Sequence, residues 1–158
     1  MEHVTSALRR AAPLAGIAAV GIAALLTSPS RAAQPDPKAV IFTLPDKIEW
    51  RLGEASDNAT LQGDPSKPGV YIQLTKWHPG HMSRPHFHST ERYITVLSGT
   101  WWIGTGNKYD PNSTYPVPAG TYVVDRAGGV HYDGAKDVEC VLEIVGTGPM
   151  TTTQAEQK

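Results

Sequence analysis

The 158-residue sequence has little cysteine, no excess of charge of either sign and no long amphipathic segment. Cys140 is its only cysteine, so no internal disulfide can form and the core must hold the fold together unaided. The formal net charge is −1, and no run of Lys or Arg is present. Nothing therefore indicates binding to nucleic acid or to an anionic membrane surface. Beyond residue 33, no segment repeats apolar residues at the 3.6-residue period of a helix.

Glycine and proline are plentiful instead, with 15 and 13 residues spread between short apolar stretches. Short stretches separated by turn signals predict many strands, arranged as a sandwich or a barrel. The clearest strand is 138–145, where Cys140, Leu142 and Ile144 share one face, so Cys140 is expected in the core rather than as a reactive thiol. The other predicted strands are 40–43, 48–52, 69–75, 93–97, 100–103 and 121–124.

The N-terminal segment differs from the rest. The pair Arg9-Arg10 precedes an almost wholly apolar run, 11–26, and small residues follow up to Ala33. This order predicts a secretory signal peptide cleaved near Ala32 or Ala33, and hence a periplasmic or secreted protein with no membrane contact after cleavage. The alternative is a retained anchor, for which the run is short. The arginine pair leaves both the general and the twin-arginine export routes open.

The sequence thus divides into four parts. They are a signal peptide (1–32), a linker (33–38), one barrel domain (39–150) and a flexible polar tail (151–158).

Histidines are clustered, and two of them stand in a pattern that suits metal binding. In an extended strand, residues two apart face the same side, so His86 and His88 present two imidazoles to one point and Phe87 faces the other way. Two such imidazoles are natural neighbouring ligands for Zn, Fe, Mn, Ni or Cu. Taken alone, this pattern is equally compatible with a surface accident.

The surroundings of this pair resemble the cupin superfamily. Gly80, five residues, His86-x-His88 and ten residues to Gly99 form the frame of its first motif. Gly120 opens the frame of the second, which closes on Ala127-Gly128, two residues and His131. The resemblance spans 80–135 and implies an all-β fold, a cupin-type double-stranded β-helix or jelly-roll barrel. It also implies that His86, His88 and His131 hold one divalent transition metal, with Fe(II) favoured.

One departure from the family pattern affects the expected ligands. Counted back from Gly99, the acidic ligand position is occupied by Arg92, and the nearest acid, Glu91, lies one residue early. Either a bulge lets Glu91 reach the metal, or Glu91 points away and the site has three histidines, which is the alternative slightly favoured. In a third alternative, Arg92 enters the pocket and holds an anionic substrate. Arg92 and Tyr93 are the candidate catalytic residues.

These features lead to two functional hypotheses. The first is an exported, metal-dependent oxidoreductase of dioxygenase type acting on a small molecule, an anionic one if Arg92 enters the pocket, with isomerase or lyase chemistry as variants. The second is a periplasmic module that binds or senses a small molecule or metal without turnover, which Arg92 in place of the acid would favour. A homodimer is compatible with either, because one of the adjacent residues Trp101 and Trp102 is expected to face outward.

Overall fold

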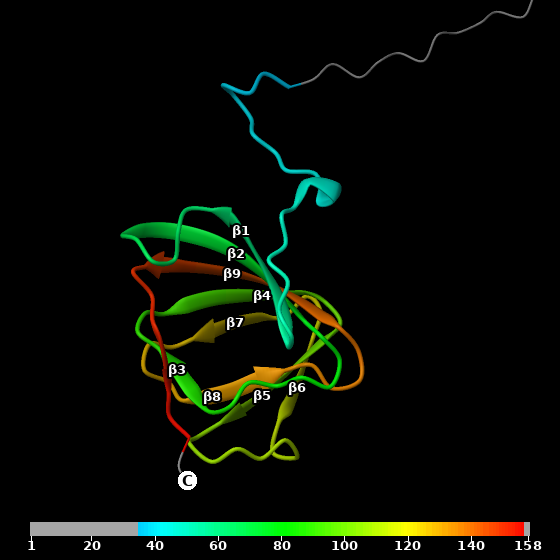
Figure 1. Ribbon diagram of the computed structural model, residues 1–158, viewed down its shortest axis with the longest axis vertical. Coiled ribbons are helices and arrows are strands. Elements are labelled where there is room, and N and C mark those ends of the chain that lie inside the picture. Colours follow the sequence, from blue (N-terminus) through cyan, green and yellow to red (C-terminus); the bar gives the residue numbers. More distant parts are fainter. Residues whose placement is uncertain (1–34, 157–158) are drawn as a thin grey trace, which may run out of the picture. The chain divides into compact units, whose positions relative to one another are not determined.

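The computed structural model describes residues 35–156, which contain ten strands, one short 3₁₀ helix and no α-helix (Figure 1). The strands form two five-stranded sheets in which every pairing is antiparallel. In spatial order, the first sheet is β1 (Ser56–Gln62), β2 (Gly69–Trp77), β9 (Cys140–Gly148), β4 (Arg92–Ser98) and β7 (Tyr122–Asp125). The second is β10 (Thr152–Gln154), β3 (His86–His88), β8 (His131–Gly134), β5 (Thr100–Thr105) and β6 (Tyr115–Pro118), and the helix η1 spans Pro45–Lys47. All the strands belong to one compact unit that begins at Ile41.

The two sheets face each other as a jelly roll, which confirms the all-β fold class predicted from the sequence. Neighbours within each sheet are mostly distant in sequence, as with β9 between β2 and β4. This connectivity brings residues about 45 positions apart, such as those of β3 and β8, side by side.

Buried and more exposed side chains alternate along the strands, and the buried ones form the core between the sheets. In β9, Cys140, Leu142 and Ile144 are buried while the residues between them are only partly covered. They pack with Ile94 of β4 and Trp101 of β5 in one apolar cluster. Cys140 is a core residue, and burial raises the pKa of its thiol to about 12, so the thiol stays protonated and unreactive at neutral pH.

Gly99 joins β4 to β5 at a point where no other residue fits. Its φ of +71° lies in the left-handed region, and a Cβ added there would clash with the carbonyl oxygen of Glu139. The turn therefore presses against the start of β9 and fixes how the chain passes from one sheet to the other.

Three expectations from the sequence differ from the structure. Residues 40–43 form no strand, and 48–52 contribute only the single bridge between Arg51 and Asn58. The expected flexible tail is wrong over Thr152–Gln154, because these residues pair with β3 along its whole length. The polar strand β1 was not predicted, and its inward-facing Ser56 and Asn58 line a polar cavity rather than the apolar core.

The predicted signal peptide, residues 1–32, lies outside the described residues. Within 35–156, no helix is long and apolar enough to cross a membrane.

A small ion-pair cluster fastens the segment before β1 to the first sheet. The carboxylate of Asp57 on β1 accepts a hydrogen bond from the backbone N–H of Gly53 and lies 3.1 Å from Nε2 of His78. Nδ1 of His78 lies 3.0 Å from the carbonyl oxygen of Glu54. These bonds to Glu54 and Asp57 raise the pKa of His78. Burial opposes ionisation of Asp57, but the bonds from Gly53 and His78 still lower its pKa.

We predict that this cluster makes stability pH-dependent in a defined direction. Protonated His78 is favoured in the folded chain, so its contribution is complete below its unfolded pKa of about 6.5 and is lost as the pH rises through the raised value. The melting temperature of the His78→Ala variant should therefore fall furthest below that of the wild type near pH 5.5, and the gap should narrow towards pH 9. Thermal unfolding across this range tests it, with His81→Ala as the control, and a gap independent of pH would contradict it.

Candidate metal centre

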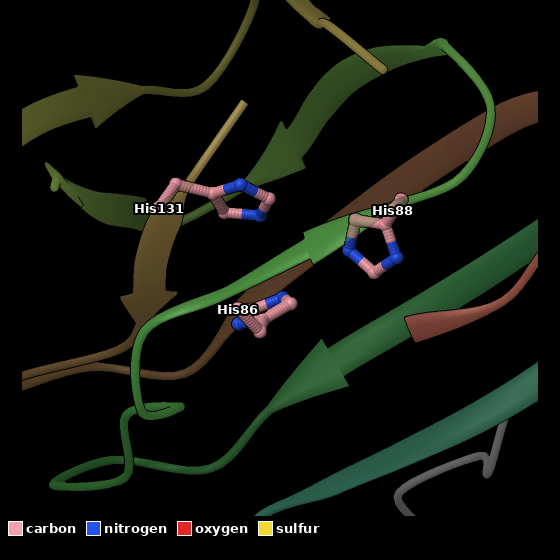
Figure 2. A group of neighbouring side chains, drawn as sticks. All are labelled: His86, His88 and His131. Atoms are coloured by element: carbon pink, nitrogen blue, oxygen red, sulfur yellow. The ribbon is translucent and has the colours of Figure 1, made fainter. Parts of the chain in front are cut away.

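Two adjacent strands bring three histidines together. β3 carries His86 and His88 on its inward face, and His86 is paired in register with His131, the first residue of β8. Figure 2 shows the three rings as neighbours, two carried by β3 and one by β8. All three are buried, with 7%, 4% and 6% of their surfaces exposed, and each offers a ring nitrogen within 4.8 Å of those of the others. Alternation in β3 predicted the first pair, and the resemblance added His131.

Each ring has the same nitrogen held by the protein. Nδ1 of His86 lies 2.8 Å from the carbonyl oxygen of Arg84, and Nδ1 of His131 lies 3.0 Å from that of Gly129. Since a carbonyl only accepts, both Nδ1 atoms carry the hydrogen, and both Nε2 atoms keep a free lone pair. Nδ1 of His88 lies 3.0 Å from Oγ1 of Thr152. That hydroxyl donates to Sδ of Met150, so it accepts from His88, which has the same tautomer as the others.

Burial keeps the two imidazoles of β3 neutral. It lowers the pKa of His86 and, together with the nearby Arg92 guanidinium, lowers the pKa of His88 to about 2. Only a neutral imidazole has the lone pair that a metal ion requires. The two histidines of β3 are therefore in the ligand form at any physiological pH.

The free nitrogens lack partners among the described residues. Nε2 of His88 and of His131 are both buried and neither makes a hydrogen bond. A buried polar atom without a partner costs about 1–3 kcal/mol, a cost that a bound ion would remove. The fixed tautomers, the shared orientation and the unpartnered atoms fit a metal, so the group His86, His88 and His131 could hold one divalent transition-metal ion.

Arg92 lies inside the barrel and is neutralised there. It occupies β4 opposite Asp125 of β7, and its Nε and Nη2 donate to one carboxylate oxygen over 2.8 and 2.6 Å. The other oxygen of Asp125 lies 3.4 Å from Nδ1 of His131. A lone guanidinium beside the histidines would repel a cation, but this ion pair carries no net charge.

Glu91 and Tyr93 are not brought to the histidines. β4 pairs regularly with β9 from Arg92 to Val96, and its only register shift lies beyond Val96, so no bulge turns Glu91 inward. Glu91 lies instead 3.9 Å from the exposed Arg126, and it raises the pKa of Tyr93, whose side chain is 44% exposed. Glu91 thus points away from the histidines, as in the favoured three-histidine alternative, and Tyr93, a candidate catalytic residue, also lies on the outer side of the sheet.

A cavity of about 260 Å³ lies between the sheets and is lined by His86, His88 and Arg92. Its lining also includes Tyr71 of β2, which sequence analysis missed. Tyr71 is fully buried, and its hydroxyl makes no hydrogen bond within the described part of the chain. Burial raises the pKa of Tyr71, so the phenol is protonated at neutral pH and can donate a hydrogen bond. An inward tyrosine in a strand resembles core filling, and no sequence signal separates the two roles.

Asp133 is a second buried group that sequence analysis missed. It lies on β8 and lines the same cavity, with one carboxylate oxygen 3.9 Å from Nε2 of His86. The Ser83 hydroxyl and the Trp101 indole N–H donate to it over 2.7 and 2.9 Å. Its position two residues after His131 on an alternating strand is the only sequence signal that could have placed it here.

Comparison with known proteins identifies the fold. No family model and no curated protein matches the sequence. Among solved structures, the polyketide cyclase RemF from Streptomyces resistomycificus aligns with a TM-score of 0.63 at 15% identity, over 75% of this chain and 87% of its own. A cupin-superfamily sugar phosphate isomerase from Silicibacter pomeroyi gives 0.56 at 18% identity, over 71% and 80%.

A third solved structure, a cupin-2 domain from Rhodospirillum rubrum, gives a TM-score of 0.56 at 11% identity, over 72% of this chain and 78% of its own. Identities this low show a shared fold and nothing more specific. The described residues thus have the cupin-type double-stranded β-helix that the two motifs implied.

We predict that Thr152 raises the metal affinity of the site by orienting His88. Thr152→Val removes the acceptor for Nδ1–H of His88 while keeping a β-branched side chain in β10. Loss of a hydrogen bond that orients a ligand lowers metal affinity by about 10–100-fold. Metal titration of the chelator-stripped protein measures this, with Thr153→Val, the neighbouring exposed residue of the same strand, as the matched control. Equal affinities for the two variants would contradict the prediction.

Proposed function

We propose that this cupin-type barrel is an exported, metal-dependent enzyme that acts on a small polar molecule. The observation that carries the proposal is the group of three buried histidines, of which His86 and His88 line a cavity. A structural metal site is closed by four protein ligands, whereas three nitrogen ligands leave positions open to substrate. The opening of the polar cavity beside His86 and His88 supports a role in chemistry rather than in folding alone.

The reaction class that we propose first is dioxygenase-type oxidation. A bound Fe(II) or similar ion would supply redox chemistry and adjacent sites for substrate and oxygen. The chain offers a separate place for a small apolar reactant: a second cavity of about 250 Å³, lined mainly by apolar residues such as Ile103, Val123 and Val130, borders His131. The triad thus lies between a cavity of mixed lining, in which polar side chains accompany Ile94 and Leu142, and an apolar one, an arrangement that suits a substrate with polar groups and dioxygen.

Lewis-acid chemistry is the second candidate, favoured by two groups in the polar cavity. Tyr71 holds a proton that it can donate, and Asp133 is a buried carboxylate that can accept one. Isomerisation and elimination need such proton transfers, and a metal would stabilise the negative charge that develops on the substrate. Two of the proteins with similar folds are a cyclase and an isomerase by name, which supports Lewis-acid chemistry as a candidate.

A binding module without turnover has less support. That alternative depended on a free Arg92 weakening the metal site, and Asp125 neutralises Arg92.

The first prediction from this proposal concerns the metal itself. The mature protein, purified from its native compartment without chelators or an affinity His tag, should contain near-stoichiometric transition metal by elemental analysis. His86→Ala and His131→Ala should each lose it because each removes one of three ligands, while His81→Ala should retain it. A wild type that stays metal-free after anaerobic incubation with Fe(II), Mn(II), Cu(II) and Zn(II) would overturn the enzyme proposal.

The second prediction separates the two reaction classes. The metal-loaded protein is incubated with a small-metabolite extract under air and under argon, and the mixtures are compared by mass spectrometry. A dioxygenase should consume its substrate only under air, with both oxygen atoms of O₂ added to the products. Lewis-acid chemistry should proceed equally in both, and Tyr71→Phe should then slow it about 100-fold without loss of metal. Turnover in neither atmosphere would count against catalysis.

A further inference from the structure

The polar cavity has a second wall, which the metal centre does not use. It is built by Asn58 of β1 with Gln73 and Thr75 of β2, all on the inward face of the first sheet. The side-chain oxygen of Asn58 accepts two hydrogen bonds, each 2.8 Å long, from Nε2 of Gln73 and from the Thr75 hydroxyl. We call these three residues the amide wall.

Those two bonds fix the orientation of both amides. With its oxygen occupied, Asn58 keeps its NH₂ group free to donate. Gln73 donates one N–H to Asn58 and keeps its second N–H and its carbonyl oxygen, and the Thr75 oxygen is left as an acceptor. The amide wall thus combines donors and acceptors and carries no charge.

This mixture selects the kind of group that can bind there. A hydroxyl both donates and accepts, so it can satisfy Asn58 and Gln73 together. A carboxylate or phosphate only accepts, so it could use the N–H groups of Asn58 and Gln73 but would leave the acceptors of Gln73 and Thr75 without a donor. An alkyl group would leave the free donors and acceptors without partners, at about 1–3 kcal/mol for each buried group.

The cavity wall on the histidine side differs from the uncharged amide wall because it offers positive charge. Arg92 uses Nε and Nη2 on Asp125, and among the described residues Nη1 makes no hydrogen bond. Arg92 lines the cavity, so the edge of the guanidinium that carries Nη1 is available to an anion. The positive charge of Arg92 cancels the negative charge of Asp125. A divalent ion on the three histidines would add two positive charges, against one negative charge on Asp133, so the loaded site would carry a net positive charge.

The size of the cavity limits the substrate further. Its volume of about 260 Å³ is below the roughly 300–1,000 Å³ of sites that hold drug-sized ligands. The molecule that spans both walls is therefore small.

We propose that the substrate class of this site is a small carboxylate that carries several hydroxyl groups. Its carboxylate faces the metal side and Arg92, and its hydroxyl groups bind the amide wall. This inference rests on the proposed metal-dependent function, and it identifies Asn58 and Gln73 as residues that determine specificity.

Three probes of matched length test the proposal: gluconate, hexanoate and sorbitol. Gluconate has a carboxylate and hydroxyl groups, hexanoate lacks the hydroxyl groups, and sorbitol lacks the carboxylate. Calorimetric titration of the metal-loaded protein should show gluconate binding at least tenfold more tightly than either of the others. Metal content is measured before and after each titration, so that removal of the ion by gluconate is not mistaken for binding.

Variants of the amide wall give the second readout. Gln73→Leu and, separately, Asn58→Leu should each weaken gluconate binding about tenfold, the effect of losing a hydrogen bond of ordinary strength, without weakening hexanoate binding. Gln62→Leu, an exposed position on β1, is the matched control and should change neither. Two different substitutions guard against the misfolding of one, and thermal unfolding with metal content verifies each protein.

The possible failures point to different causes. A wild type that binds no metal overturns the proposed function on which this inference rests. A metal-loaded wild type that binds hexanoate or sorbitol as tightly as gluconate overturns the substrate class alone. Unchanged gluconate affinity in both folded amide-wall variants overturns the assignment of Asn58 and Gln73.

Discussion

The register between β3 and β8 is the constraint on which the site depends. His86 lies directly opposite His131, and this single pairing joins two sequence motifs about 45 residues apart. A shift of one residue in either strand would turn its histidines to the outer face. The register is secured from both sides, because β10 pairs with the full length of β3 and β5 pairs with the full length of β8. The geometry of the histidines is thus a property of the whole second sheet.

Sequence reasoning reached the ligands by two routes of different strength. The alternation of strand residues was enough to place His86 and His88 together, since that inference needs only local geometry. His131 required knowledge of a family pattern, because no local rule tells which distant strand will lie beside β3. The same limit left two alternatives open for Glu91, because its side depends on whether the chain bulges at the start of β4, and pairing with β9 decides that.

The groups that sequence reasoning missed share one property: they are polar side chains on inward faces. Asn58 lies in a strand so polar that it resembles a loop, and Tyr71 resembles ordinary core filling. Both face the interior because the sheets enclose a cavity there, and a cavity is formed by many strands together. Arg92 was placed inside the barrel as one alternative, but its partner Asp125 was not foreseen, since the two are joined only through the β4–β7 pairing. Buried ion pairs of this kind offset desolvation only when both members are present.

The histidine site is completed by β10, the last strand that the structure describes, which pairs with β3. Thr152 contacts His88 across 64 residues of chain, and His131 joins His86 across about 45. While the polypeptide is being synthesised, β3 emerges with neither neighbour and cannot yet present a fixed ligand set. The second neighbour arrives only with the last strand that the structure describes. A chain that stops short of residue 152 therefore carries His88 without the hydroxyl that lies beside its Nδ1 in the complete second sheet.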